Sequence, residues 1–163
     1  MVTQQFEFII KGGTAATING IGPADIGISG GKIVAIGDIG GSGARVLDAK
    51  GLHILPGVID TQVHFREPGL EHKEDLASGT TAAVLGGVTG VFEMPNTRPS
   101  TTTAELLADK FRRARGRVRC DIAVYVGASP ENVAELGKLE RMPGCAGVKI
   151  FMGSSTGNLL IPD

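Results

Sequence analysis

Hydrophobic and polar positions follow different rhythms on the two sides of Pro56. Before it, short apolar or alternating runs are separated by glycine-containing turns, a pattern that is typical of strands. We expect strands over 6–11, 25–29, 32–36, 46–48 and 53–55, with a two-residue hairpin turn at Gly30-Gly31. Residues 1–56 are therefore predicted to form a small antiparallel β unit, part of a β-sandwich.

From Gly57 the pattern changes to an alternation of strands and helices. Apolar runs predict strands over 58–65, 88–94, 120–126 and 146–152, and the segments between them predict helices over 73–85, 104–114 and 131–139. Gly86-Gly87 would end the first helix, and a run of threonines would cap the start of the second. This repetition predicts a parallel sheet with right-handed crossovers.

The polar residues of the first of these strands distinguish a closed barrel from an open doubly wound sheet. Asp60, Gln62, His64 and Arg66 are spaced two residues apart, so a regular strand would place them on one face and Ile59, Val63 and Phe65 on the other. Polar side chains at the carboxyl end of a strand are typical of barrel active sites, and no glycine-rich phosphate turn follows. We predict an α/β chain in which 57–163 form the first four β/α units of a (β/α)8 TIM barrel, which usually needs about 250 residues.

Composition narrows the classes of function. The chain has 163 residues, 42% of them hydrophobic, and a net charge of −1, so it can form a core but has no excess of positive charge for nucleic acid. Cys120 and Cys145 have neither metal-binding nor disulfide spacing, and neither a secretory leader nor an apolar run long enough to span a membrane is visible. We expect a cytoplasmic protein with a small-molecule substrate, acting on neither nucleic acid nor membranes.

Candidate metal ligands lie in the first and fourth predicted strands of 57–163. Gln62 and His64 are two residues apart, a spacing that lets two side chains of a strand reach one ion. Lys149 lies in an apolar strand, where a lysine is costly unless it has a partner or a function. The alternatives are a buried, hydrogen-bonded imidazole and a lysine whose ammonium group reaches solvent.

Three sequence blocks occur in order: LPGVIDTQVHFREPG at 55–69, SGTTAAVLGGVT at 78–89 and MPNTRP at 94–99. Together they resemble the amidohydrolase superfamily, and specifically the dihydroorotase family. The resemblance implies a zinc-dependent cyclic amidase that interconverts dihydroorotate and N-carbamoyl-L-aspartate in pyrimidine biosynthesis. The chemistry it implies is attack of a metal-activated hydroxide on a ring carbonyl.

The resemblance also implies roles for individual residues. His64 and Lys149 would bind one or two Zn²⁺, with Lys149 carboxylated by CO₂ to give an anionic oxygen ligand. Arg66 and Asn96 would bind the carboxylate of the substrate, for which a guanidinium supplies a planar pair of donors. The alternatives are an ion pair of Arg66 with Glu67 or Asp75, and a turn at Asn96.

The sequence departs from the family pattern at Gln62, which stands where the family has the first histidine of H-x-H. An amide oxygen is a weak zinc ligand, so one metal position is in doubt. This leaves open a non-catalytic scaffold, such as a partner of aspartate transcarbamoylase. The rival enzyme reading is an allantoinase or hydantoinase.

The family's remaining histidine ligands and its catalytic aspartate would lie beyond Asp163. We therefore assign no catalytic residue and expect the chain of 163 residues to be inactive by itself. The full-length protein is expected to be a homodimer.

Overall fold

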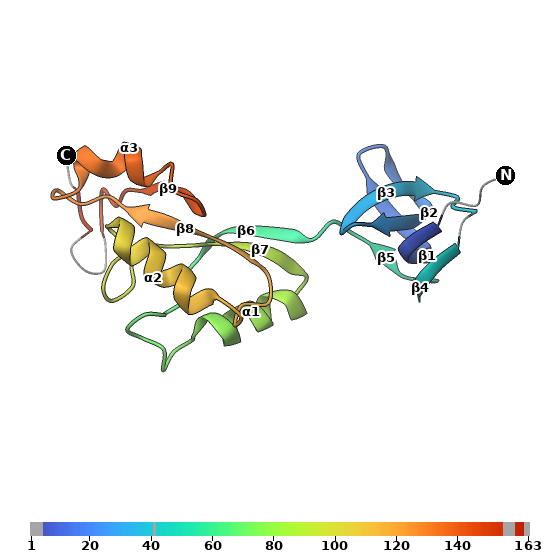
Figure 1. Cartoon of the computed structure of the whole chain (residues 1–163), viewed down its shortest axis with the longest axis horizontal. Coiled ribbons are helices and arrows are strands. Elements are labelled where there is room, and N and C mark those ends of the chain that lie inside the picture. The colour runs from blue at the N-terminus through green and yellow to red at the C-terminus, as the bar shows by residue number, and fades with distance from the viewer. Residues whose placement is uncertain (1–4, 41, 155–158, 162–163) are drawn as a thin grey trace. The chain divides into compact units, whose positions relative to one another are not determined.

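The computed structural model describes residues 5–40, 42–154 and 159–161, and is drawn in Figure 1. The chain forms two compact units, Met1–Pro56 and Gly57–Asp163. Within the described ranges, no helix is both long enough and apolar enough to cross a membrane.

The first unit is a five-stranded sheet with strands β1 (Gln5–Thr17), β2 (Gly20–Ser29), β3 (Lys32–Gly37), β4 (Ser42–Asp48) and β5 (His53–Ile54). The order is β3-β2-β1-β4, and β5 also pairs with β1. The pairs β1–β2 and β2–β3 are antiparallel, whereas β4 and β5 run parallel to β1. The expectation of a purely antiparallel unit was wrong, because the chain crosses from β3 to the other edge of β1 before it forms β4.

The sequence analysis also missed the length of β1 and β2. Both strands continue to a two-residue turn at Ile18 and Asn19, where Thr17 pairs with Gly20. Gly20 follows the turn with a φ of 118°, a conformation that favours glycine, so the Asn19-Gly20 dipeptide was a visible sign of a turn in this segment. The core of the unit forms around Phe6, Ile9 and Ile39.

The second unit contains a four-stranded sheet in the order β6-β7-β8-β9, with all neighbouring strands parallel. The elements are β6 (Val58–Val63), α1 (Leu76–Leu85), β7 (Val88–Glu93), α2 (Ala104–Ala114), β8 (Asp121–Gly127), the 3-10 turn η1 (Val133–Glu135), α3 (Leu136–Leu139) and β9 (Cys145–Lys149). This α/β arrangement is a curled, partial barrel sheet, as the strand–helix alternation predicted.

Two helices begin at side-chain caps. α1 starts at Leu76 and not at Lys73, because the Asp75 carboxylate accepts a hydrogen bond from the Ser78 N–H and ends the preceding loop. The Thr103 hydroxyl caps α2 in the same way, as the run of threonines predicted. The predicted helix over 131–139 is only a 3-10 turn followed by the single turn of α3.

Two apolar clusters join the helices to one face of this sheet. Phe65, Leu76, Val91 and Ala114 form the first, and Leu107, Val124, Val126 and Leu139 form the second. Figure 1 shows α1 and α2 lying along the sheet on the same side. The opposite face carries Phe92 and Tyr125, whose rings meet edge to face with centroids 6.1 Å apart.

Candidate active site

The carboxyl ends of the outer two strands hold the strongest candidate metal ligands. His64 directly follows β6, and Lys149 is the last residue of β9. Lys149 pairs with Gly127, while the preceding Val148 pairs with Val126 of the helix-covered cluster. Alternation along β9 therefore places Lys149 on the face opposite the helices. The Lys149 ammonium lies 5.1 Å from the centre of the Phe151 ring, within range of a cation–π interaction.

The register of β6 breaks before His64. Asp60 pairs with Val91 and Val63 pairs with Glu93, so three steps along β6 match two steps along β7. The uninterrupted alternation expected from Asp60 to Arg66 was therefore wrong, because the ladder contains an extra residue. Gln62 lies inside this irregular stretch, is exposed, and donates its backbone N–H to the Asp60 carboxylate at 3.0 Å.

A hydrogen bond of 2.9 Å joins His64 Nδ1 to Asn96 Oδ1. Because an amide oxygen only accepts, Nδ1 carries the proton and the Nε2 lone pair is the one directed at a metal or another donor. Metal-binding histidines are commonly held by such a bond from their second nitrogen. The described residues contain no group of three or more His, Cys, Asp or Glu that could hold a metal, so His64 and Lys149 fit only part of a zinc site.

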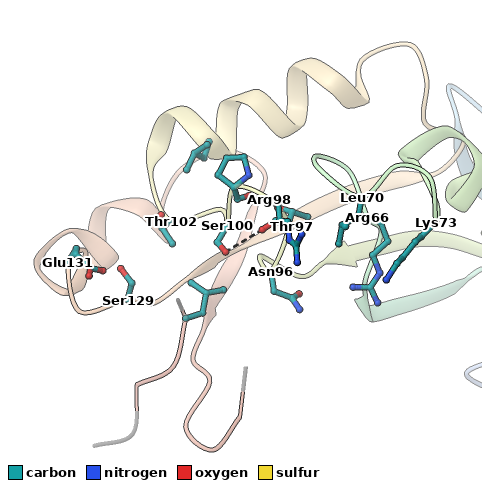
Figure 2. A pocket seen from close by; sticks show the side chains of 13 residues that line it. Arg66, Leu70, Lys73, Asn96, Thr97, Arg98, Ser100, Thr102, Ser129 and Glu131 are labelled. Carbon is teal, nitrogen blue, oxygen red and sulfur yellow. Dashed lines mark hydrogen bonds between the residues drawn. The ribbon is translucent and has the colours of Figure 1, made fainter. Parts of the chain in front are cut away.

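A pocket of about 600 Å³ lies beside these residues, a volume suited to a small molecule. Figure 2 shows Arg66 and Lys73 at one end, Ser129 and Glu131 at the other, and Asn96 between them. Arg66 and Asn96, the two predicted substrate-binding residues, thus line one pocket. The residues that line it do not include Gln62, His64 or Lys149, and His64 is connected to it through its hydrogen bond with Asn96.

The two loops that carry Arg66 and Asn96 are fixed to each other next to the pocket. The Arg98 N–H donates to the Pro68 carbonyl at 3.0 Å. Gly69 has a φ of 98°, and a Cβ at this position would lie 2.5 Å from the Arg98 Cβ. Only glycine fits this close approach. The sequence analysis did not identify Arg98 or Lys73, which bring two further cations to the pocket.

Glu67 is buried and anchors the loop that follows β6. Its carboxylate accepts two hydrogen bonds from the Arg117 guanidinium, at 2.6 and 3.0 Å, and a third from the Leu76 N–H at 3.1 Å. Arg117 also lies 3.9 Å from Asp75. The partners considered as alternatives for Arg66 are therefore both paired with Arg117, which supports a role for Arg66 in the pocket.

A buried ion pair lies behind the pocket, between α2 and the end of β7. Lys110 Nζ is 3.1 Å from Glu93 Oε1, and the two side chains are 2% and 0% exposed. Burial raises the pKa of Glu93 to about 7 despite the nearby Lys110, and burial lowers the pKa of Lys110. The sequence analysis missed this pair, although a glutamate in an apolar strand and a lysine three residues after Leu107 were visible.

The fold is shared with solved hydantoinases. An L-hydantoinase (dihydropyrimidinase) from Arthrobacter aurescens is 33% identical, with a TM-score of 0.83 over 96% of this chain and 35% of that chain. A D-hydantoinase is 30% identical, with a TM-score of 0.81 and the same coverage. The chain therefore shares the fold of about a third of each of these two proteins.

The sequence comparisons then define the family. The sequence model of the dihydro-orotase-like family matches residues 51–148, and the chain belongs to this family. An allantoinase from Salmonella paratyphi B is 40% identical over 150 residues, which are 91% of this chain and 33% of the relative. The chain thus spans about a third of the length of these relatives, whose names match the rival reading of the sequence better than dihydroorotase.

Proposed function

We propose that the chain is part of a cyclic amidase of the allantoinase or hydantoinase type, which hydrolyses an amide bond within a small ring. The observation that carries this proposal is the His64–Asn96 hydrogen bond, which connects a candidate metal ligand to a pocket of suitable volume. The family and the names of the relatives support the same class of reaction.

The roles proposed for the residues follow from their chemistry. The Arg66 guanidinium and the Asn96 amide would orient the polar groups of the ring. His64, and Lys149 after carboxylation, would hold Zn²⁺, with Gln62 as a weak additional ligand. Zinc bound there would polarise a carbonyl of the ring and acidify a water molecule. The hydrogen bond from His64 Nδ1 to Asn96 would fix the tautomer in which Nε2 is the ligand.

Dihydroorotase is the second candidate, and the charge of the pocket favours it. Arg66, Lys73 and Arg98 line the pocket together with a single acidic residue, Glu131. Such an excess of positive charge suits a ring that bears a carboxylate, whereas an uncharged hydantoin ring gains little from it. The description of the family as dihydro-orotase-like points in the same direction.

The test uses the polypeptide that the gene encodes, loaded with zinc and supplied separately with allantoin, hydantoin and dihydroorotate. We expect hydrolysis of at least one ring, and the preferred ring decides between the two candidates. Failure on all three would refute the class of reaction.

Arg66→Met separates binding from chemistry. For dihydroorotate it should raise KM by about 10- to 100-fold, since a hydrogen bond to a charged group contributes roughly 1.5–3 kcal/mol. Arg112→Met is the matched control, because Arg112 lies exposed on α2 and pairs only with Asp109 among the described residues. It should leave KM unchanged.

A further inference from the structure

The buried pair Glu93–Lys110 contacts the backbone of the two segments that carry Arg66 and Asn96. Glu93 Oε2 accepts a hydrogen bond from the Phe65 N–H at 2.9 Å, and Phe65 lies between His64 and Arg66. Lys110 Nζ donates to the Met94 carbonyl at 3.2 Å, two residues before Asn96. The pair therefore holds both segments that carry the candidate site.

Further contacts make this arrangement continuous. The Met94 N–H donates to the Val63 carbonyl at 2.9 Å, so the two segments leave the sheet side by side. The His64–Asn96 bond then joins the side chains that project from them. A displacement of Phe65 or Met94 would change the distance between these side chains, because each anchor lies only one or two positions along the chain from the residue it places.

We propose that Glu93 and Lys110 are positioning residues of the active site, with the Glu93 carboxylate setting the Phe65 backbone and thereby the placement of His64 and Arg66. This inference rests on the proposed function of the same site. It extends that function to residues that line no part of the pocket. A lysine and a glutamate with almost no exposure to solvent are costly to bury, and replacing such a pair with apolar residues is often neutral or stabilising.

Stability alone therefore does not account well for this pair. A purely structural role requires only that the cavity between α2 and β7 be filled and its charges balanced. A positioning role requires in addition an acceptor for the Phe65 N–H. The two roles can be separated by variants that share the loss of charge and differ only in this acceptor.

The experiment compares Glu93→Gln/Lys110→Met with Glu93→Met/Lys110→Met. Both remove the ion pair and retain similar volume, but only the glutamine variant keeps an oxygen for the Phe65 N–H. Amide hydrogen exchange of Phe65, divided by that of Val124 in the second cluster, measures the local anchoring independently of global stability. Asp109→Asn is the control on α2, because it removes a partly exposed ion pair with Arg113.

We expect the exchange ratio to be on the order of tenfold or more higher in the methionine variant than in the glutamine variant, because the methionine variant loses one buried hydrogen bond. In the polypeptide that the gene encodes, KM for the preferred ring should rise in the methionine variant alone. The control should change neither quantity.

An equal exchange ratio in the two double variants would overturn the proposal. So would a raised ratio with identical kinetics, because the segment would then be released without consequence for the site. A wild-type protein that hydrolyses none of the three rings refutes the proposed function instead, and the exchange ratio still decides whether Glu93 anchors Phe65.

Discussion

Replacing Gly79 with alanine should destabilise the second unit, although helix propensity predicts the opposite. Gly79 lies inside α1 and is buried, and a Cβ at this position would lie 2.5 Å from Cδ1 of the Phe65 ring. Phe65 is itself buried in the first apolar cluster with Leu76 and Val91. The ring therefore has little space into which it can move.

The magnitude follows from two opposing effects. Alanine in place of glycine stabilises a helix interior by about 0.8–1 kcal/mol. Forcing an additional methyl group into a packed core costs about 1–3 kcal/mol. The second effect should be near the upper end here, because the contact is well below any normal carbon–carbon distance and the obstructing atoms belong to a buried ring. We expect a net loss of about 1–2 kcal/mol.

The assay is chemical denaturation of the wild type, Gly79→Ala and Gly137→Ala. Gly137 lies in α3, is exposed, and a Cβ there would meet no atom within 4 Å, so this substitution should be neutral or slightly stabilising. The same exchange is thus expected to destabilise the protein at position 79 and not at position 137. A gain in stability from Gly79→Ala equal to that from Gly137→Ala would show that Phe65 does not pack against α1 as described.

Three further predictions concern the buried pair and the metal. At pH 8, Lys110→Met alone should lower the free energy of unfolding by about 3–5 kcal/mol, since it leaves the Glu93 charge buried, and Glu93→Gln/Lys110→Met should restore much of this loss. Burial raises the folded-state pKa of Glu93 from 4.5 to about 7, although the charges of Lys110 and Arg66 lower it. Between pH 4.5 and pH 7 the folded state therefore holds a proton on Glu93 that the unfolded state has released. As pH falls from 7 to 4.5, the free energy of unfolding of the wild type should therefore rise relative to that of the double variant, by up to about 1.4 kcal/mol per pH unit. Denaturation curves in which the two free energies of unfolding change in parallel with pH would contradict this. Gln62→His should raise the zinc content per chain of the encoded polypeptide, measured by elemental analysis with wild type in parallel, and equal zinc would mean that position 62 does not limit binding.

Local patterns were sufficient to predict most of the second unit. The strand–helix alternation after Gly57 and the cap of α2 at Thr103 depend on residues close in sequence, so they were visible without the structure. The parallel pairing of β4 with β1 was not, because strand direction depends on which edge the chain reaches after β3. The break in β6 was also hidden, since a bulge depends on the partner strand and leaves the alternation of residue types intact.

The candidate site was predicted to a similar extent. Arg66 and Asn96 were singled out by the resemblance to the dihydroorotase family, and both line one pocket of the structure. Glu67, Glu93 and Lys110 were missed because their partners lie 17 to 50 residues away, and pattern reasoning has no access to such pairings. An acidic or basic residue within an apolar run is the only local sign of a buried ion pair.

The positions of the buried charges also indicate what a glutamine at position 62 can and cannot affect. The backbone that carries His64 and Arg66 is held by the carboxylates of Glu93 and Glu67, through the Phe65 N–H and the Arg117 guanidinium. Gln62 is exposed and contributes to neither anchor. Substitutions at exposed positions away from such features usually change stability by no more than about 0.5 kcal/mol, so the sequence can vary there without loss of the fold. Under the proposed function, the glutamine would change the ligand offered to a metal and leave the two anchors of the His64 and Arg66 backbone in place.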